Sequence, residues 1–189
     1  MSKPQRRQPK QARALATRAA IFEATARILE SDGEAALTTN AIAARAGVSV
    51  GTLYEYFADK QAILVAMAYA ENERVRARIV AEAAEGLSAT RAAIRAQIEI
   101  LADRPATRRA ALKAILDAES VQSLRRETAL TGHLIQRPET PDALDSFIMT
   151  RAVLGVIRAA VLESSPHLRD PRLEDALVRL VDRYAAPGP

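Results

Sequence analysis

Residues that start and stop helices recur along this chain, and no run of alternating β-branched residues is long enough to form a strand. The segments between these signals are rich in alanine, leucine, arginine and glutamate, whose side chains lose little rotamer freedom in a helix. Glycine is scarce, whereas 49% of the residues are hydrophobic, enough for a packed core. The sequence therefore predicts an all-α protein.

The same signals divide the chain into a series of expected helices. The first ends before Gly33, which fits a left-handed position. Several of the following helices begin after a threonine, serine or aspartate that can cap them. The last two begin at a proline in the first helical position, where its missing N–H costs nothing. The expected helices cover residues 14–31, 38–47, 50–56, 60–85, 89–102, 106–129, 141–164 and 171–184.

Composition excludes several classes of protein. Cysteine is absent, so disulfides and thiolate metal sites are ruled out, and His133 and His167 are too far apart for zinc-ligand spacing. No stretch approaches the roughly 18 apolar residues of a membrane span, and the basic N-terminus lacks the apolar run of a secretory signal. No nucleophile elbow or paired-carboxylate motif occurs. We expect a cytoplasmic protein that is not an enzyme and needs no cofactor.

Positive charge is concentrated at the N-terminus of a chain whose net charge is +4. A basic arm of this kind reaches phosphates or a minor groove in many DNA-binding proteins, but it is also common as a solubilising tail. We expect residues 1–13 to form a disordered basic arm and leave both roles open. The cations that precede the first acidic residue, Glu23, are Lys3, Arg6, Arg7, Lys10, Arg13 and Arg18.

The stretch LTTNAIAARAGVSVGTLYEYFADKQAIL, residues 37–64, has the pattern of a helix-turn-helix. Ala43 supplies the small side chain needed where the next helix crosses, and Gly47 supplies the positive φ of the turn. Ile42, Val48 and Leu53 are apolar positions that pack the two helices together. A short turn between two short helices is the geometry that places the second helix in a major groove.

The second helix of this pattern, residues 50–56, would be the recognition helix. Leu53 and Phe57 are spaced i, i+4 and should face inward, leaving the hydroxyls of Tyr54 and Tyr56 for phosphates or base edges. The aromatic residues could simply belong to a core. However, three of the seven aromatic residues of the chain fall within four positions, and a short exposed helix cannot bury all of them.

The string TLYEYFADKQAIL resembles the signature of the TetR family of transcriptional regulators, and LTTNAIAARAGVS upstream matches it too; the resemblance covers residues 14–70. It implies a three-helix DNA-binding domain at 14–60, continued by the fourth helix at 60–85, and a helical effector-binding and dimerisation domain at 86–189. In the family, most of the positions that match this segment and contact DNA do so through its backbone. The positions that match Asn40 and Val50 can help to read bases. With the capping residues included, the expected DNA-binding residues are Thr38, Thr39, Asn40, Ser49, Val50, Gly51, Thr52, Tyr54, Tyr56 and Lys60.

The helix expected at 141–164 is apolar on nearly all sides, and the last helix carries an apolar stripe. The resemblance implies that these two helices pair with their copies in a four-helix bundle. The alternative is a monomer whose own core lies there. The expected interface residues are Phe147, Val153, Val156, Ile157, Ala160, Leu173, Leu177, Leu180 and Val181.

The resemblance also implies a ligand pocket among the middle helices. Their walls are mainly aliphatic, which suits an uncharged or weakly acidic, mostly aliphatic effector. We therefore expect a homodimeric repressor that binds a palindromic double-stranded operator and is released by a small molecule. The alternative is an effector-independent DNA-binding structural or interaction protein on the same fold. The expected ligand-binding residues are Ile98, Leu101, Leu116, Gln122, Phe147 and Arg151.

Overall fold

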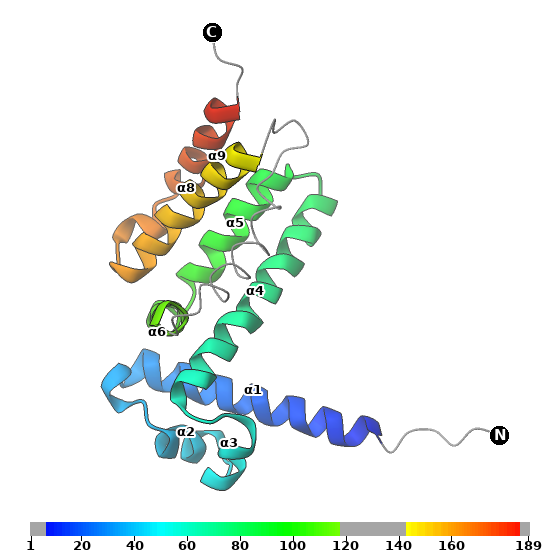
Figure 1. Ribbon diagram of the computed structural model, residues 1–189, viewed down its shortest axis with the longest axis vertical. Coiled ribbons are helices and arrows are strands. Elements are labelled where there is room, and N and C mark those ends of the chain that lie inside the picture. Colours follow the sequence, from blue (N-terminus) through cyan, green and yellow to red (C-terminus); the bar gives the residue numbers. More distant parts are fainter. Residues whose placement is uncertain (1–6, 118–142, 186–189) are drawn as a thin grey trace, which may run out of the picture. The chain divides into compact units, whose positions relative to one another are not determined.

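The computed structural model describes residues 7–117 and 143–185, and within these ranges the chain forms helices and no strand (Figure 1). The predicted all-α class is confirmed. The chain divides into two compact units, residues 1–64 and 65–189. The division falls inside helix α4, Lys60–Ala84, a few residues beyond the predicted boundary at 60. None of the helices in the described ranges is long and apolar enough to span a membrane.

The first unit contains α1 (Arg7–Ser31), the short 3-10 turn η1 (Glu34–Ala36), α2 (Thr39–Ala46), α3 (Val50–Tyr56) and the start of α4. Helix α1 begins seven residues earlier than predicted, so residues 7–13 are helical rather than part of a disordered arm. Pro9 does not prevent this because it lies in the first turn, where its missing N–H has no partner to lose.

Buried apolar side chains from three helices hold the first unit together. Ile21 and Ile28 of α1 are fully buried, and so are Ile42 of α2 and Leu53 of α3. Ala43 is also buried, where a larger side chain would separate the helices, and α2 contacts both α1 and α3. This core fixes the position of α3 on α2, which the helix-turn-helix requires.

The second unit contains the rest of α4, α5 (Ala89–Ala102), α6 (Pro105–Asp117), α8 (Ala143–Leu162), the 3-10 turn η2 (Pro166–Arg169) and α9 (Arg172–Ala185). Ser88 caps α5 as predicted, accepting from the N–H of Arg91 at 3.3 Å. Asp170 accepts from the N–H of Arg172 at 2.9 Å and so begins α9. The predicted end of α6 at 129 and the predicted start of α8 at Pro141 lie outside the described residues.

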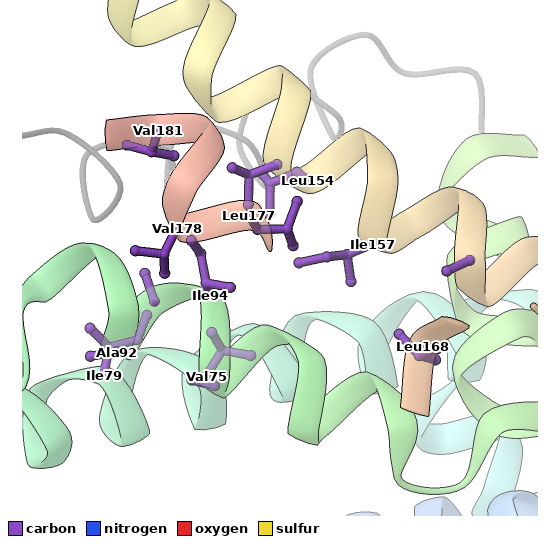
Figure 2. Close-up of a cluster of buried hydrophobic side chains, with 14 of the residues drawn as sticks. Val75, Ile79, Ala92, Ile94, Leu154, Ile157, Leu168, Leu177, Val178 and Val181 are labelled. Carbon is purple, nitrogen blue, oxygen red and sulfur yellow. The ribbon is translucent and has the colours of Figure 1, made fainter. Parts of the chain in front are cut away.

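The core of the second unit joins α4, α5, α8 and α9 (Figure 2). In Figure 2, Val178 of α9 lies beside Ile94 of α5, and Leu177 lies beside Leu154 of α8. Ion pairs reinforce the contact between α5 and α9. The guanidinium of Arg95 donates two hydrogen bonds of 2.9 Å to the carboxylate of Glu174.

The structure corrects the predicted interface. Ile157 is fully buried within a single chain, and four other predicted interface residues are at most 7% exposed. These five residues therefore have almost no surface left to bury against a partner. The apolar stripe of the last helix, α9, faces the core of its own chain. Phe147, Val156 and Leu180 are exposed as the prediction required, and Leu173 packs at the edge of the core. The residues withdrawn from the interface are Val153, Ile157, Ala160, Leu177 and Val181.

Candidate nucleic-acid interface and candidate ligand cavity

The turn between α2 and α3 has the left-handed conformation that the sequence predicted. Gly47 has φ 69° and ψ 30°, and its N–H donates to the carbonyl of Ala44 at 3.3 Å. The next N–H, of Val48, donates to the carbonyl of Ala43 at 3.1 Å. These bonds give donors to carbonyls that the end of α2 would otherwise leave without one, and they turn the chain out of the helix at Gly47.

Side-chain caps fix the starts of both helices. The hydroxyl of Thr38 accepts from the N–H of Ala41 at 3.1 Å, and that of Ser49 accepts from the N–H of Thr52 at 2.9 Å. Ser49 also donates its own proton to the Thr52 hydroxyl at 2.9 Å. Because Thr38 and Ser49 are occupied as caps, they position the interface, and any contact with DNA would use their remaining hydrogen-bonding capacity.

Helix α3 presents one face to its own core and the other to solvent. Leu53 and Phe57 are buried, as their i, i+4 spacing predicted. On the outer face Val50 is 37% exposed and Tyr54 is 52% exposed. A hydrogen bond of 3.3 Å joins the hydroxyls of Tyr54 and Thr39, linking α3 to the first turn of α2. This face offers hydroxyls and one apolar side chain, which suit phosphates and a thymine methyl group.

Lys60 places a cation beside the beginning of α2. Its ammonium group donates to the carbonyl of Leu37 at 3.2 Å, and Leu37 directly precedes the capping residue Thr38. Asp59 accepts from the N–H of Ala62 at 2.8 Å and so fixes the first turn of α4 that carries Lys60. A positive charge next to a helix N-terminus is a favourable environment for a phosphate.

All ten predicted DNA-binding residues lie in the first unit, on α2, α3, their caps and the first turn of α4. The sequence placed Arg18 only among the N-terminal cations and did not predict its contact with aromatic rings. Its guanidinium lies 5.8 Å from the ring centroids of both Phe22 and Phe57, and those two rings are also 5.8 Å apart. Since Phe57 ends α3, Arg18 helps to anchor that end. The i, i+4 spacing of Arg18 and Phe22 is the signal that could have revealed it.

The second unit contains a cavity of about 40 Å³ lined by α4, α5, α6 and α8. Leu101 is the only predicted ligand residue found among its described lining residues. The other described ones do not line it: Leu116 and Phe147 are exposed, Ile98 packs against the apolar core, and the Arg151 guanidinium lies over the Phe147 ring, 5.1 Å from its centroid. Gln122 lies outside the described residues.

The cavity is more polar than the aliphatic walls that the sequence predicted. Glu71 and Asn72 of α4 line it, together with Gln97 of α5. Arg108 forms a buried ion pair with Glu71, and its Nε donates to the carbonyl of Ile100 at 3.0 Å. Burial raises the pKa of the Glu71 carboxyl, although Arg108 and Arg74 oppose this shift, and burial lowers the pKa of Arg108.

The described residues hold no group of three or more histidine, aspartate or glutamate side chains placed to bind a metal ion. In the first unit, Arg45 and Asp32 form an ion pair, with 3.0 Å between a guanidinium nitrogen and a carboxylate oxygen. The candidate chemistry of the first unit is therefore the binding of an anion by hydroxyls, a lysine and helix N–H groups.

Comparisons with known proteins agree with this geometry. Residues 21–67 match the family model described as bacterial regulatory proteins, tetR family. No curated protein matches the chain. Among solved structures, a TetR transcriptional regulator from Rhodococcus sp. RHA1 is 19% identical with a TM-score of 0.66, covering 91% of this chain and 97% of its own.

Two further solved structures share the fold. The fatty acid degradation regulator FadR from Bacillus halodurans is 17% identical with a TM-score of 0.67, covering 90% of this chain and 95% of its own. The multidrug binding protein EbrR, solved in complex with imidazole, is 24% identical with a TM-score of 0.59. The match covers 91% of this chain and 96% of EbrR. Residues 21–67 thus form a TetR-family helix-turn-helix domain, and the chain has the fold of the TetR-family transcriptional regulators.

Proposed function

We propose that this protein is a homodimeric transcriptional repressor that binds a palindromic operator and leaves it when a small molecule binds. The observation that carries the proposal is the outer face of α3, where Val50 and Tyr54 are exposed on a helix with fixed ends. A seven-residue helix keeps an aromatic side chain in solvent at the expense of hydrophobic burial, which favours a role in binding.

On DNA, α3 would lie in the major groove. Val50 would contact a thymine methyl group, while Thr52 and Tyr54 would donate to phosphates or base edges. Lys60 and the first N–H groups of α2 would hold a phosphate on one side of the groove. Gly51 has no side chain, so the backbone of α3 can come close to the sugar-phosphate strand.

The dimer would form on the exposed apolar face of α8 and α9. Several large apolar side chains on these two helices remain in solvent in a single chain, which is unusual for a monomer when they are contiguous. Helices α8 and α9 pack side by side, and so they can present one surface to a second copy. A two-fold dimer presents two recognition helices in inverted orientation and therefore fits a palindromic site. The exposed residues are Leu144, Phe147, Ile148, Val156, Leu180 and Tyr184.

The DNA-binding proposal is tested with Tyr54→Ala, Tyr54→Phe and Lys60→Ala, on a duplex enriched from a random pool by the wild-type protein. Tyr54→Ala and Lys60→Ala should each weaken binding in a gel shift, while circular dichroism shows an unchanged fold. Tyr54→Phe separates the hydroxyl from the ring. Lys113→Ala removes an exposed lysine of α6 and serves as the matched control for Lys60→Ala. Wild-type affinity in both alanine variants would contradict the assignment of α3 as the recognition helix.

The dimer proposal is tested with two adjacent positions that the structure separates. Val156 is 45% exposed, so Val156→Arg can be solvated in a monomer but not inside an interface. Ile157 is fully buried, so Ile157→Arg should unfold the chain itself. Light scattering should show dimers for the wild type and folded monomers for Val156→Arg. A monomeric wild type at micromolar concentration would contradict the proposal.

Release by an effector is the part of the proposal that the cavity supports. EbrR, a protein of the same fold, was solved in complex with imidazole, so the fold can accommodate a small molecule. An effector must bind the DNA-free form more tightly than the DNA-bound form, and DNA must weaken effector binding by the same factor. An effector-independent protein on this fold is the alternative, and it predicts that no ligand changes the affinity for the duplex.

A further inference from the structure

We propose that Glu55 is a base-reading residue of α3, whose carboxylate accepts a hydrogen bond from the amino group of a cytosine in each half of the operator. This inference rests on the proposed function, since it names a base that the proposed interface selects. Glu55 is the only acidic residue of α3, and it does not belong to the DNA-binding residues that the sequence predicted.

The position of Glu55 on the helix gives the first reason. Leu53 and Phe57 are buried, and Glu55 lies two residues from each of them. At about 3.6 residues per turn, this spacing places Glu55 on the opposite side of α3, and its side chain is indeed exposed. Gly51 lies four residues earlier on the same side and has no side chain. A duplex that approaches the outer face of α3 therefore meets the carboxylate of Glu55.

The availability of this carboxylate gives the second reason. Within residues 7–117 and 143–185, Glu55 takes part in no hydrogen bond or ion pair. Nearby cations are already engaged, since Arg45 pairs with Asp32 and Lys60 donates to the carbonyl of Leu37. The fold of the first unit does not use the carboxylate of Glu55, which remains available to a bound molecule.

The charge of Glu55 restricts the group that it can contact. A carboxylate accepts hydrogen bonds and donates none, and the phosphates of DNA repel it. In the major groove, guanine and thymine present acceptors, and adenine presents its amino group beside the acceptor N7. Cytosine presents an amino group with no acceptor on its own edge. Glu55 therefore favours cytosine over the other three bases.

The test begins with the inverted repeat that the wild-type protein enriches from a random pool. Each half-site position is changed to all four base pairs, and fluorescence anisotropy gives the affinity of the wild type, Glu55→Ala and Glu55→Gln. We expect the wild type to prefer cytosine at one position of each half-site by about fivefold or more. Glu55→Ala should lose the preference at that position alone. Glu55→Gln should move it to adenine, because an amide can accept from N6 and donate to N7.

A change in the DNA tests the same contact from the other side. Pyrimidin-2-one in place of the selected cytosine removes the amino group from the major groove. It should weaken wild-type binding by about the same factor and leave the affinity of Glu55→Ala unchanged. Glu30→Gln makes the same change of charge at an exposed position of α1 and should keep the cytosine preference. Circular dichroism should show the wild-type fold for all variants.

The outcomes separate this inference from the proposed function. Loss of the cytosine preference in Glu55→Ala supports both. If the wild type enriches a repeat but both Glu55 variants keep its base preferences, the inference fails and the DNA-binding proposal stands. Tighter binding of both variants to every duplex, with the preferences unchanged, would show a carboxylate that only repels phosphates and would also overturn the inference. If the wild type enriches no sequence, the proposed function fails and the inference fails with it.

Discussion

Replacing Gly51 by alanine should stabilise the protein and weaken its binding to DNA. Gly51 lies in the second position of α3, and its backbone has ordinary helical geometry rather than a positive φ. A methyl group there would lie 3.8 Å from the Ser49 hydroxyl, an ordinary van der Waals distance. The site therefore accepts a side chain without strain. Alanine in place of glycine in a helix contributes about 0.5–1 kcal/mol, a gain that is smaller close to a helix end.

The same methyl group would stand on the surface that α3 presents to DNA. If Gly51 permits a close approach of the backbone to a phosphate, the methyl group must push the strand away. One lost charge-assisted or backbone hydrogen bond is worth about 0.5–3 kcal/mol, which corresponds to a loss in affinity of between twofold and about a hundredfold. Stability and affinity should thus change in opposite directions.

Urea unfolding followed by circular dichroism measures the first effect, and fluorescence anisotropy with an enriched duplex measures the second. Thr17→Ala removes a hydroxyl that donates to the Arg13 carbonyl on α1 at 3.0 Å and serves as a control for general effects of substitution in the first unit. A Gly51→Ala protein with higher stability and wild-type DNA affinity would refute the placement of Gly51 at the DNA strand. Lower stability would refute the helical geometry.

Further substitutions test the turn, the dimer face and an ion pair. Gly47→Ala should lower the free energy of unfolding by about 1–2 kcal/mol in urea titrations, because its φ of 69° is left-handed, and Gly47→Asn should cost less. Gly155 lies exposed on α8 with open space around it, so Gly155→Ala should stabilise a monomer but weaken a dimer that needs close approach there, as sedimentation would show. Hydrogen bonds from Arg95 and Arg91 lower the pKa of Glu174. Its stabilising effect should be complete above about pH 4.5 and disappear as the pH falls through the lowered pKa, so the difference in stability between Glu174→Gln and wild type should be full at pH 7 and shrink as the pH falls below 4.5.

The helix-turn-helix could be predicted from sequence because its determinants are local. Thr38 and Ser49 cap helices by bonding to N–H groups three residues away, and Gly47 adopts a conformation that depends on its own lack of a side chain. Leu53 and Phe57 are inward because they repeat at helical spacing. None of these features needs knowledge of a distant part of the chain.

The start of α1 was less predictable. Pro9 and the run of basic residues resemble a tail, yet a proline in the first turn is compatible with a helix, and arginine, glutamine and alanine favour one. The helix propensity of residues 7–13 therefore decides their structure, and the positive charge they carry does not prevent the helix.

The orientation of α8 could not be predicted, because the helix is apolar on nearly all sides. Val156 and Ile157 are neighbours of similar character, and only the packing of α5 and α9 decides that Ile157 faces the core and Val156 faces solvent. The cavity presents the same difficulty. Asn72, Gln97 and Arg158 belong to three helices, and their proximity depends on tertiary packing.

Selection of binding sites from a pool of random DNA duplexes tests the central claim most directly. We expect the wild-type protein to enrich an inverted repeat, with recognition helices in successive major grooves about 34–36 Å apart. We also expect Tyr54→Ala to enrich no sequence under the same conditions. Enrichment of a single, non-repeated site, enrichment of no site by the wild type, or the same repeat with Tyr54→Ala would contradict this claim.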